Sequence, residues 1–271
     1  MKKLISIIIP VYNEQDNVNK CYQELSKITK RLSKNYKFEF IFTDNSSTDN
    51  TFNLLKKLQK KFKNVRIFKL SKNFGYQRSI WTGYSLSRGH AAIEYDCDLQ
   101  DPPELLPKFL QKWEMGFKII YGIRKRRREN IIINILRKIY YRLLNSISDT
   151  ELPYDAGDFM LIDRTIVNLL KEEYDTNIYL RGLVFSYGFP KIGLEYSRNK
   201  RIAGRSKFGF IQLFKLAGDG IISNSTLPLR LFLYIGILIF LFSVCLIVYY
   251  FISWLNDPSS LPSGFTTLVL L

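Results

Sequence analysis

The chain has 271 residues, and its 46% hydrophobic content with 24% charged residues excludes a disordered or low-complexity protein. Its 40 Lys and Arg against 24 Asp and Glu give a net charge of +16, which favours nucleic acid or an anionic membrane surface as a partner. Cys21, Cys97 and Cys245 are odd in number and follow no metal-binding or disulfide spacing, so we expect a reducing compartment and no disulfide framework.

Up to about residue 122, short apolar runs alternate with amphipathic stretches. The runs predict strands at residues 4–9, 38–43, 65–70, 91–95 and 118–121, with helices between them. This alternation is typical of repeated strand–helix–strand units and predicts an α/β fold with a largely parallel sheet. The first run follows two lysines and so resembles a signal peptide, but it is short and lacks a small-residue cleavage site. We therefore expect a first buried strand there.

Three of these predicted strands end in polar clusters, at residues 10–14, 44–49 and 96–103. In open α/β sheets, ligands bind outside the carboxyl ends of the strands, so we expect the three clusters to converge on one cleft. Ser47, Thr48 and Asp49 would also cap the helix that follows them, and we expect both roles for this cluster. The segment 71–75, after the third strand, is also consistent with a plain turn.

The third cluster places Asp96 and Asp98 one residue apart at the mouth of a predicted buried strand. Mg²⁺ and Mn²⁺ are hard cations that proteins bind through one or two carboxylates together with substrate phosphates. The pair therefore favours a site for a nucleotide diphosphate. By itself the pattern is weak, because a solvated turn with Asp101 capping a helix that begins with proline would look the same.

A long apolar run near the C-terminus predicts a transmembrane helix over residues 229–255. Residues 231–255 carry no charge, and 17 of these 25 residues are Leu, Ile, Phe or Val. Such a run gains roughly 5 to 10 kcal/mol on insertion into a bilayer. The Lys and Arg lie before residue 231, so the positive-inside rule places the N-terminal part on the cytoplasmic side of the cell (inner) membrane. With this helix present, we expect the lipid bilayer as the partner and no nucleic acid.

Other segments also predict contact with the bilayer. Residues 131–144 and 208–222 mix apolar and basic side chains and predict amphipathic helices in the headgroup plane, although plain surface helices would show the same pattern. Residues 1–225 would then form one cytoplasmic domain that includes these helices. Residues 256–271 predict a turn and the start of a second transmembrane helix that is truncated here. A single span also allows a homo-oligomer to form through the membrane.

Eight ordered motifs carry a resemblance to a known family. They stand at residues 10–14, 44–49, 70–75, 96–103, 155–159, 181–183, 203–207 and 225–230. In this order they resemble family 2 glycosyltransferases of the GT-A fold, and among these the polyprenyl-phosphate glycosyltransferases. The resemblance runs from about residue 4 to residue 255. One departure is Asn45, where these enzymes commonly carry a second Asp, and it leaves the details of base or ribose recognition open.

This resemblance implies an inverting transfer of a sugar, glucose or a related hexose, from a nucleotide diphosphate sugar such as UDP-glucose to polyprenyl (undecaprenyl) phosphate. It implies Mg²⁺ or Mn²⁺ as the cofactor, with the metal ligands Asp96, Asp98 and Gln100. The positions that match the nucleotide-sugar site are Pro10, Tyr12, Glu14, Asp44, Asp96 and Lys207. The positions that match catalytic roles are Asp98, Asp158 and Arg205. Those that match the acceptor-phosphate site are Arg124 and Arg137.

Two other interpretations stay open. A membrane-tethered family 2 enzyme with a polysaccharide or other hydroxyl acceptor would need a well-placed general base, whereas a phosphate acceptor is already anionic at pH 7. A catalytically inert lipid-binding protein is disfavoured by the intact Asp96, Asp98 and Gln100. The basic run at residues 126–128 fits solvated charge as well as phosphate binding, and Asp158 fits a structural carboxylate that orients an arginine.

Overall fold

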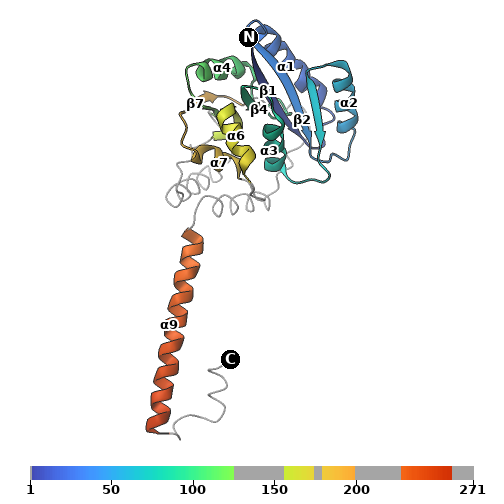
Figure 1. Cartoon of the computed structure of the whole chain (residues 1–271). Helices are drawn as coiled ribbons and strands as arrows, with labels where there is room; N and C mark the ends of the chain where they lie inside the picture. Colours follow the sequence, from blue (N-terminus) through green and yellow to red (C-terminus); the bar gives the residue numbers. More distant parts are fainter. Residues whose placement is uncertain (1, 125–155, 174–178, 199–226, 258–271) are drawn as a thin grey trace. The chain divides into compact units, whose positions relative to one another are not determined.

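The computed structural model describes residues 2–124, 156–173, 179–198 and 227–257 (Figure 1). The chain divides into two compact units, Met1–Asn224 and Ser225–Leu271. The first unit contains a sheet with helices on both faces, and the second contains one long apolar helix. The predicted α/β class is therefore confirmed.

The first unit is built on a seven-stranded sheet in the order β3-β2-β1-β4-β6-β5-β7. Its strands are β1 (Lys3–Val11), β2 (Tyr36–Asp44), β3 (Val65–Lys69), β4 (Ala91–Glu94), β5 (Ile119–Arg124), β6 (Ala156–Asp163) and β7 (Lys191–Tyr196). The first five overlap the strands expected from the apolar runs, and the last two were not expected. Strands β1 to β4 pair in parallel, and so do β5 and β7, whereas β6 is antiparallel to both of its neighbours. The sheet is therefore parallel on one side of β4 and mixed beyond it.

Helices cover both faces of this sheet (Figure 1). On one face lie α1 (Val18–Leu32), α2 (Thr51–Lys61) and α4 (Leu106–Glu114), the last of which follows a short 3-10 turn at Pro103–Leu105. On the other face lie α3 (Tyr76–Leu86), α6 (Arg164–Glu172) and α7 (Leu180–Ser186). Each helix buries apolar side chains against the sheet, and this burial fixes which side of the helix faces inward.

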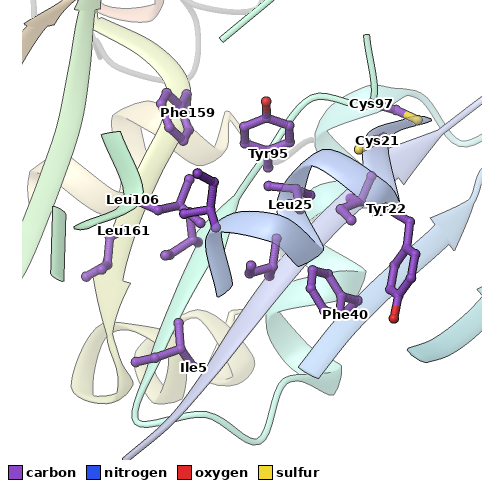
Figure 2. Close-up of a cluster of buried hydrophobic side chains, with 14 of the residues drawn as sticks. Ile5, Cys21, Tyr22, Leu25, Phe40, Tyr95, Cys97, Leu106, Phe159 and Leu161 are labelled. Carbon is purple, nitrogen blue, oxygen red and sulfur yellow. The ribbon is translucent and has the colours of Figure 1, made fainter. Parts of the chain in front are cut away.

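Strand β1 separates two hydrophobic clusters, because its side chains alternate between the two faces of the sheet. Ile5 and Ile7 pack in the cluster under α1 and α4, and Ile8 packs in the cluster under α3. In the first cluster, the ring of Phe159 on β6 meets the ring of Tyr95 edge-on, with 5.6 Å between the ring centres (Figure 2). This contact holds the chain after β4 against β6, so the residues that follow Tyr95 lie beside those that precede Phe159.

Buried charges at the amino ends of the strands have a structural role. Glu39 accepts hydrogen bonds from Ser6 Oγ (2.6 Å) and from the backbone N–H of Arg88 (2.8 Å), and Arg66 pairs with it at 2.8 Å. Burial by itself raises the pKa of Glu39, but these partners outweigh burial and hold the pKa below its usual range. The buried carboxylate of Glu39 thus has hydrogen-bond and ion-pair partners within the fold, which gives it a structural role away from the carboxyl edge of the sheet.

The second unit contains α9 (Leu227–Asn256). Its segment Leu229–Asn256 is long and apolar enough to cross a membrane, with a mean hydropathy of 3.0 and no part of that apolar stretch buried inside the protein. These properties agree with the span expected over residues 229–255. The predicted interfacial helices at 131–144 and 208–222 lie outside the described residues, and so does the predicted second span.

Candidate functional site

The loops after β1, β2 and β4 lie at the carboxyl edge of the sheet, where the sequence predicts a ligand cleft. Each loop contains one non-glycine residue with a left-handed backbone, namely Asn13 (φ 53°), Ser46 (φ 62°) and Leu99 (φ 58°). This conformation is uncommon outside glycine, and it is most costly for a bulky residue such as Leu99. Three such residues at one edge favour a functional role for these loops.

The loops after β1 and β2 are locked to each other. The side-chain oxygen of Asn13 accepts a hydrogen bond from the backbone N–H of Thr48 (2.8 Å), and the N–H of Asn13 donates to Ser47 Oγ (2.9 Å). At the start of α2, Asp49 Oδ1 accepts a hydrogen bond from the N–H of Thr51 (2.9 Å). The N-cap of α2 is Asn50, which makes no side-chain cap bond, so of the three expected capping residues only Asp49 bonds a backbone N–H of this helix among the described contacts.

Asp44 ends β2 and is fully buried. Its Oδ1 accepts a hydrogen bond from the N–H of Ser47 (3.1 Å), whereas its Oδ2 is buried without a hydrogen-bond partner in the part of the chain that the structure describes. An orphaned buried carboxylate oxygen is costly, so a polar ligand group at this point would be stabilising. Three further residues that the sequence assigns to the nucleotide sugar lie on β1 or in the loop after it: Pro10, Tyr12 and Glu14.

Asn45, which departs from the family pattern, ties the segment 71–75 to this edge. Its Nδ2 donates to Asn73 Oδ1 (2.8 Å), and its Oδ1 accepts a hydrogen bond from the N–H of Phe74 (2.9 Å). A carboxylate cannot donate, so an Asp at this position would lose the bond to Asn73. The segment 71–75 is therefore bonded to the end of β2.

Asp96 and Asp98 lie in the loop that begins after β4, and Asp98 is buried. Asp98 Oδ1 accepts a hydrogen bond from the N–H of Gln100 (3.1 Å). Asp96 Oδ1 accepts one from Tyr76 Oη on α3 (2.8 Å), and the same hydroxyl oxygen lies 3.2 Å from Glu94 Oε1. Tyr76 therefore connects the Asp-x-Asp motif to a third carboxylate, which the sequence analysis missed.

Glu94 is fully buried in β4, and among the described residues its Oε2 has no hydrogen-bond partner. Burial, followed by the charges of Asp96 and Asp158, raises the pKa of Glu94 well above the usual carboxyl range. Burial and the charges of Asp101 and Asp98 likewise raise the pKa of Asp96 to about 7. The sequence carried a signal for Glu94, since it is an acid within the apolar run of β4, two residues before Asp96 and thus on the same side of an extended chain.

Asp158 joins this group from β6. Arg181 Nη2 on α7 lies 3.0 Å from Asp158 Oδ2, and Gln77 Nε2 on α3 donates to Asp158 Oδ1 (3.5 Å). Gln77 also accepts a hydrogen bond from the N–H of Leu180 (3.3 Å), which fixes its side-chain amide. Alternation along β6 turns Phe159 into the core on one face and Asp158 toward α3 on the other. The carboxylate is thus oriented by α3 and α7 together.

Arg124 ends β5 and points into an acidic network. Its Nε donates to Tyr196 Oη (3.2 Å), and its Nη2 lies 3.8 Å from Asp101 Oδ2. Tyr196 Oη in turn donates to Asp101 Oδ1, and Arg198 contacts both Asp101 and Asp96. These contacts hold the guanidinium of Arg124 in place, and its role toward an acceptor phosphate stays a prediction.

The oxygen atoms at this edge suit a divalent cation. Asp96 and Asp98 provide carboxylates, Gln100 provides an amide, and Mg²⁺ and Mn²⁺ prefer such hard oxygen ligands. Within the described part of the chain, no three His, Cys, Asp or Glu side chains form a complete metal site. A cation here would therefore take some of its ligands from substrate phosphates, as is usual for Mg²⁺. The remaining predicted site residues lie outside the described residues: Arg137, Arg205 and Lys207.

Most of the chain is similar in sequence to known proteins. A family model described as Glycosyl transferase family 2 matches residues 6–170. The putative glycosyltransferase CsbB of Bacillus subtilis (strain 168) is 34% identical over 265 residues, which are 98% of this chain and 80% of that protein. Bactoprenol glucosyl transferase of Shigella phage SfX is 32% identical over 236 residues, which are 87% of this chain and 77% of that protein.

Solved structures share the fold at low identity. The mannosyltransferase PcManGT from Pyrobaculum calidifontis, in complex with GDP-Man and Mn²⁺, matches with a TM-score of 0.54 and 15% identity over 76% of this chain, and the match spans 59% of that solved chain. Mannosyl-3-phosphoglycerate synthase from Rubrobacter xylanophilus matches with a TM-score of 0.51 and 15% identity, over 80% of this chain and 71% of that one. The chain therefore belongs to glycosyltransferase family 2, and its sheet-containing unit has the GT-A fold.

Proposed function

We propose that the chain transfers a hexose, with inversion at the sugar carbon, from a nucleotide diphosphate sugar to a polyprenyl phosphate. The relative named bactoprenol glucosyl transferase supports a bactoprenol lipid as the acceptor and glucose as the sugar. We take undecaprenyl phosphate and UDP-glucose as the reacting forms. The observation that carries this proposal is the pair Asp96 and Asp98 at the carboxyl edge of the sheet, the same edge at which Asp44 has an orphaned buried oxygen.

The donor would lie across the carboxyl ends of β1, β2 and β4. Asp44 would accept a hydrogen bond from the nucleoside with its orphaned oxygen. Asp96, Asp98 and Gln100 would hold Mg²⁺ or Mn²⁺ on the diphosphate. When bound, this cation supplies charge neutralisation for the departing nucleotide. The hydroxyl of Tyr76 fixes the orientation of the Asp96 carboxylate.

The reacting sugar develops positive charge at its anomeric carbon as the nucleotide leaves. Asp158, oriented by Arg181 and Gln77, would stabilise that charge from the β6 side of the site. The acceptor phosphate is itself anionic at pH 7, so the transfer needs little general-base assistance and does need cations that bring two anions together. The cations that we propose for this task are Arg124, Arg137, Arg205 and Lys207.

We place the reaction at the cytoplasmic face of the cell membrane. Helix α9 has the length and apolar surface of a span, and no Lys or Arg follows Arg230, so the positive-inside rule favours a cytoplasmic Met1–Asn224 unit. A polyprenyl phosphate is confined to the same membrane, so a tether raises its effective concentration at the site.

Radiolabelled transfer tests this function. The purified full-length chain is incubated with Mn²⁺, undecaprenyl phosphate in liposomes, and a panel of UDP- and GDP-sugars. We expect an organic-extractable product that is labile to mild acid, with UDP-glucose as the best donor. Undecaprenol, which lacks the phosphate, is the matched acceptor control and should give no product. Transfer to undecaprenol or to a polysaccharide, without transfer to undecaprenyl phosphate, would overturn the acceptor and support the hydroxyl-acceptor alternative.

A further inference from the structure

Arg198, two residues after β7, bridges two carboxylates of the site. Its Nη2 lies 3.5 Å from Asp96 Oδ2, and its Nε lies 3.3 Å from Asp101 Oδ1. The Arg198 side chain keeps 30% of its surface exposed, so solvent and solutes reach it. It is therefore a charged side chain that touches the Asp-x-Asp motif and remains accessible to a ligand.

The two carboxylates depend on Arg198 to different degrees. Asp101 is almost fully buried, and it also accepts the Tyr196 hydroxyl and pairs with Arg124. For Asp96, by contrast, Arg198 is the one cation in contact among the residues that the structure describes. Removing the Arg198 charge would leave Asp101 paired with Arg124, and it would leave Asp96 without a salt-bridge partner among the described residues.

Asp96 is also a proposed ligand of the divalent cation. A guanidinium and a metal ion are both positively charged, so each weakens the binding of the other to one carboxylate. Arg198 therefore competes with the metal for Asp96 in the arrangement seen here. Phosphate oxygens are strong partners for arginine, so a bound diphosphate offers the guanidinium an alternative contact.

We propose that Arg198 is a positioning residue that pairs with Asp96 while the donor site is empty and releases Asp96 to the divalent cation when a nucleoside diphosphate binds. The guanidinium then turns to the diphosphate oxygens and keeps Asp101 as its second contact. This inference rests on the proposed metal-assisted transfer from a nucleotide sugar. Arg198 then has two opposite effects. It weakens binding of the metal ion alone, and it strengthens binding of the metal ion together with a nucleotide.

The first effect can be measured without turnover, as the affinity of the full-length chain in detergent for Mn²⁺. The electron paramagnetic resonance signal of free Mn²⁺ reports how much of the ion is unbound. Arg198→Gln removes the charge and should bind Mn²⁺ alone about two- to fivefold more tightly than wild type, the scale of one partly exposed ion pair. With UDP present the order should reverse. Arg198→Gln should bind UDP together with Mn²⁺ about tenfold more weakly, because a charge-assisted contact to phosphate is lost.

Two further variants sharpen the comparison. Arg198→Lys keeps the charge but lacks the planar fork that spans two carboxylates, so its affinity for Mn²⁺ alone should lie between those of wild type and Arg198→Gln. Arg31→Gln, at the exposed C-terminal end of α1, is the matched control for the loss of one positive charge and should leave both affinities unchanged.

The possible failures are distinguishable. An unchanged or weakened affinity of Arg198→Gln for Mn²⁺ alone would overturn the inference, because a merely structural role predicts weaker binding in both measurements. Absence of Mn²⁺ binding by wild type in the presence of UDP would instead overturn the proposed metal-assisted function. Thermal midpoints compared with those of Arg31→Gln identify a misfolded variant, and Arg198→Lys decides the matter if Arg198→Gln does not fold.

Discussion

Tyr76 donates a hydrogen bond to Asp96, with 2.8 Å between Oη and Oδ1. Tyr76 is the first residue of α3, and the preceding Gly75 has φ 89°, a backbone conformation that other residues rarely adopt. The hydroxyl oxygen also lies 3.2 Å from Glu94 Oε1. A hydroxyl has one proton, so donation to Asp96 requires Glu94 to supply the proton of the second bond. The pKa of Glu94, raised first of all by burial, agrees with a neutral carboxyl there.

Tyr76→Phe should lower kcat/KM for the nucleotide sugar about ten- to a hundredfold, because a hydrogen bond to a charged group contributes about 1.5 to 3 kcal/mol. Ser85→Ala is the control on the same helix, since the Ser85 hydroxyl donates to the Trp81 carbonyl within α3 (2.9 Å). The control should keep wild-type kinetics. Steady-state rates with the donor varied measure both variants, and equal kinetics would remove the positioning role from Tyr76.

Asp98→Ala should abolish transfer and the Mn²⁺-dependent binding of UDP, because the cation loses a ligand and the diphosphate charge is left uncompensated. Asp98→Asn should be inactive too, although it keeps an oxygen that can accept the Gln100 N–H, and Asp96→Ala should be nearly as severe. Asp16→Ala removes an exposed acid and is the control. Wild-type turnover at saturating Mn²⁺ in a correctly folded Asp98→Ala protein would contradict the metal assignment.

The strands that the sequence predicted are those with a strong local pattern. Strand β4 was predicted as buried because the run 91–95 is apolar apart from Glu94, and in the structure both faces of the strand are covered. Strand β6 was missed because its continuous apolar stretch is only residues 159–162 and its partners β4 and β5 lie far from it in sequence. A strand of that kind is defined by its pairing, which no local pattern encodes.

In the site, too, local sequence patterns predicted some residues, and contacts between distant elements determined the others. The acids and amides at the strand ends follow from chain order, because parallel strands end at one edge. Their partners come from other elements: Tyr76 reaches Asp96 from α3, and Arg181 reaches Asp158 from α7. These pairings depend on how the helices pack on the sheet. Likewise, the sequence does not explain why residue 45 is Asn where relatives commonly have Asp, whereas the structure shows that the Asn45 amide donates to Asn73.

Arg124→Ala should raise the KM for polyprenyl phosphate about ten- to a hundredfold, and more than the KM for the nucleotide sugar, because a charge-assisted contact to phosphate is lost. Tyr196→Phe is the control, since it removes the hydroxyl that links Arg124 to Asp101 and keeps the guanidinium. It should change the acceptor KM far less. Kinetics with each substrate varied separately decide the matter, and an effect confined to the nucleotide sugar would exclude the acceptor role.

Asp163 makes the stability of the first unit depend on pH. Its carboxylate accepts hydrogen bonds from Trp113 Nε1 (2.7 Å) and the N–H of Thr165 (3.0 Å), and it pairs with Lys118 at 3.0 Å. Burial raises its pKa, but these partners outweigh burial and lower the pKa to about 2. Because the folded-state pKa lies below that of the unfolded chain, the stabilisation is complete above about pH 4 and is lost as the pH falls toward about 2, in total about 2 kcal/mol.

Asp163→Asn should therefore flatten the acid side of the stability curve. The asparagine still has an oxygen that can accept the Thr165 N–H, but it carries no charge to titrate. Urea denaturation of the full-length chain from about pH 6 to about pH 3 should show a steeper loss of the free energy of unfolding for wild type than for the variant. Asp16→Asn, at an exposed position, should follow wild type. Parallel curves for wild type and Asp163→Asn would contradict this account.

A chain that ends at Asn224 should keep nucleotide binding and lose most of its transfer to long-chain polyprenyl phosphate in membranes. The candidate donor residues belong to the Met1–Asn224 unit, whereas α9 belongs to Ser225–Leu271. A membrane helix confines enzyme and acceptor to one thin layer, and such confinement typically raises the effective affinity about a hundredfold or more.

Two measurements on the shortened chain test the separate halves of this prediction. Calorimetric titration with UDP and Mn²⁺ should match that of the full-length chain, because the binding residues are all retained. Transfer in liposomes should fall steeply, while transfer to a short, water-soluble polyprenyl phosphate, the matched control, should persist because that acceptor needs no membrane. Equal activity in liposomes with and without residues 225–271 would show that the apolar segment is dispensable, and it would favour the tethered transferase with a hydroxyl acceptor.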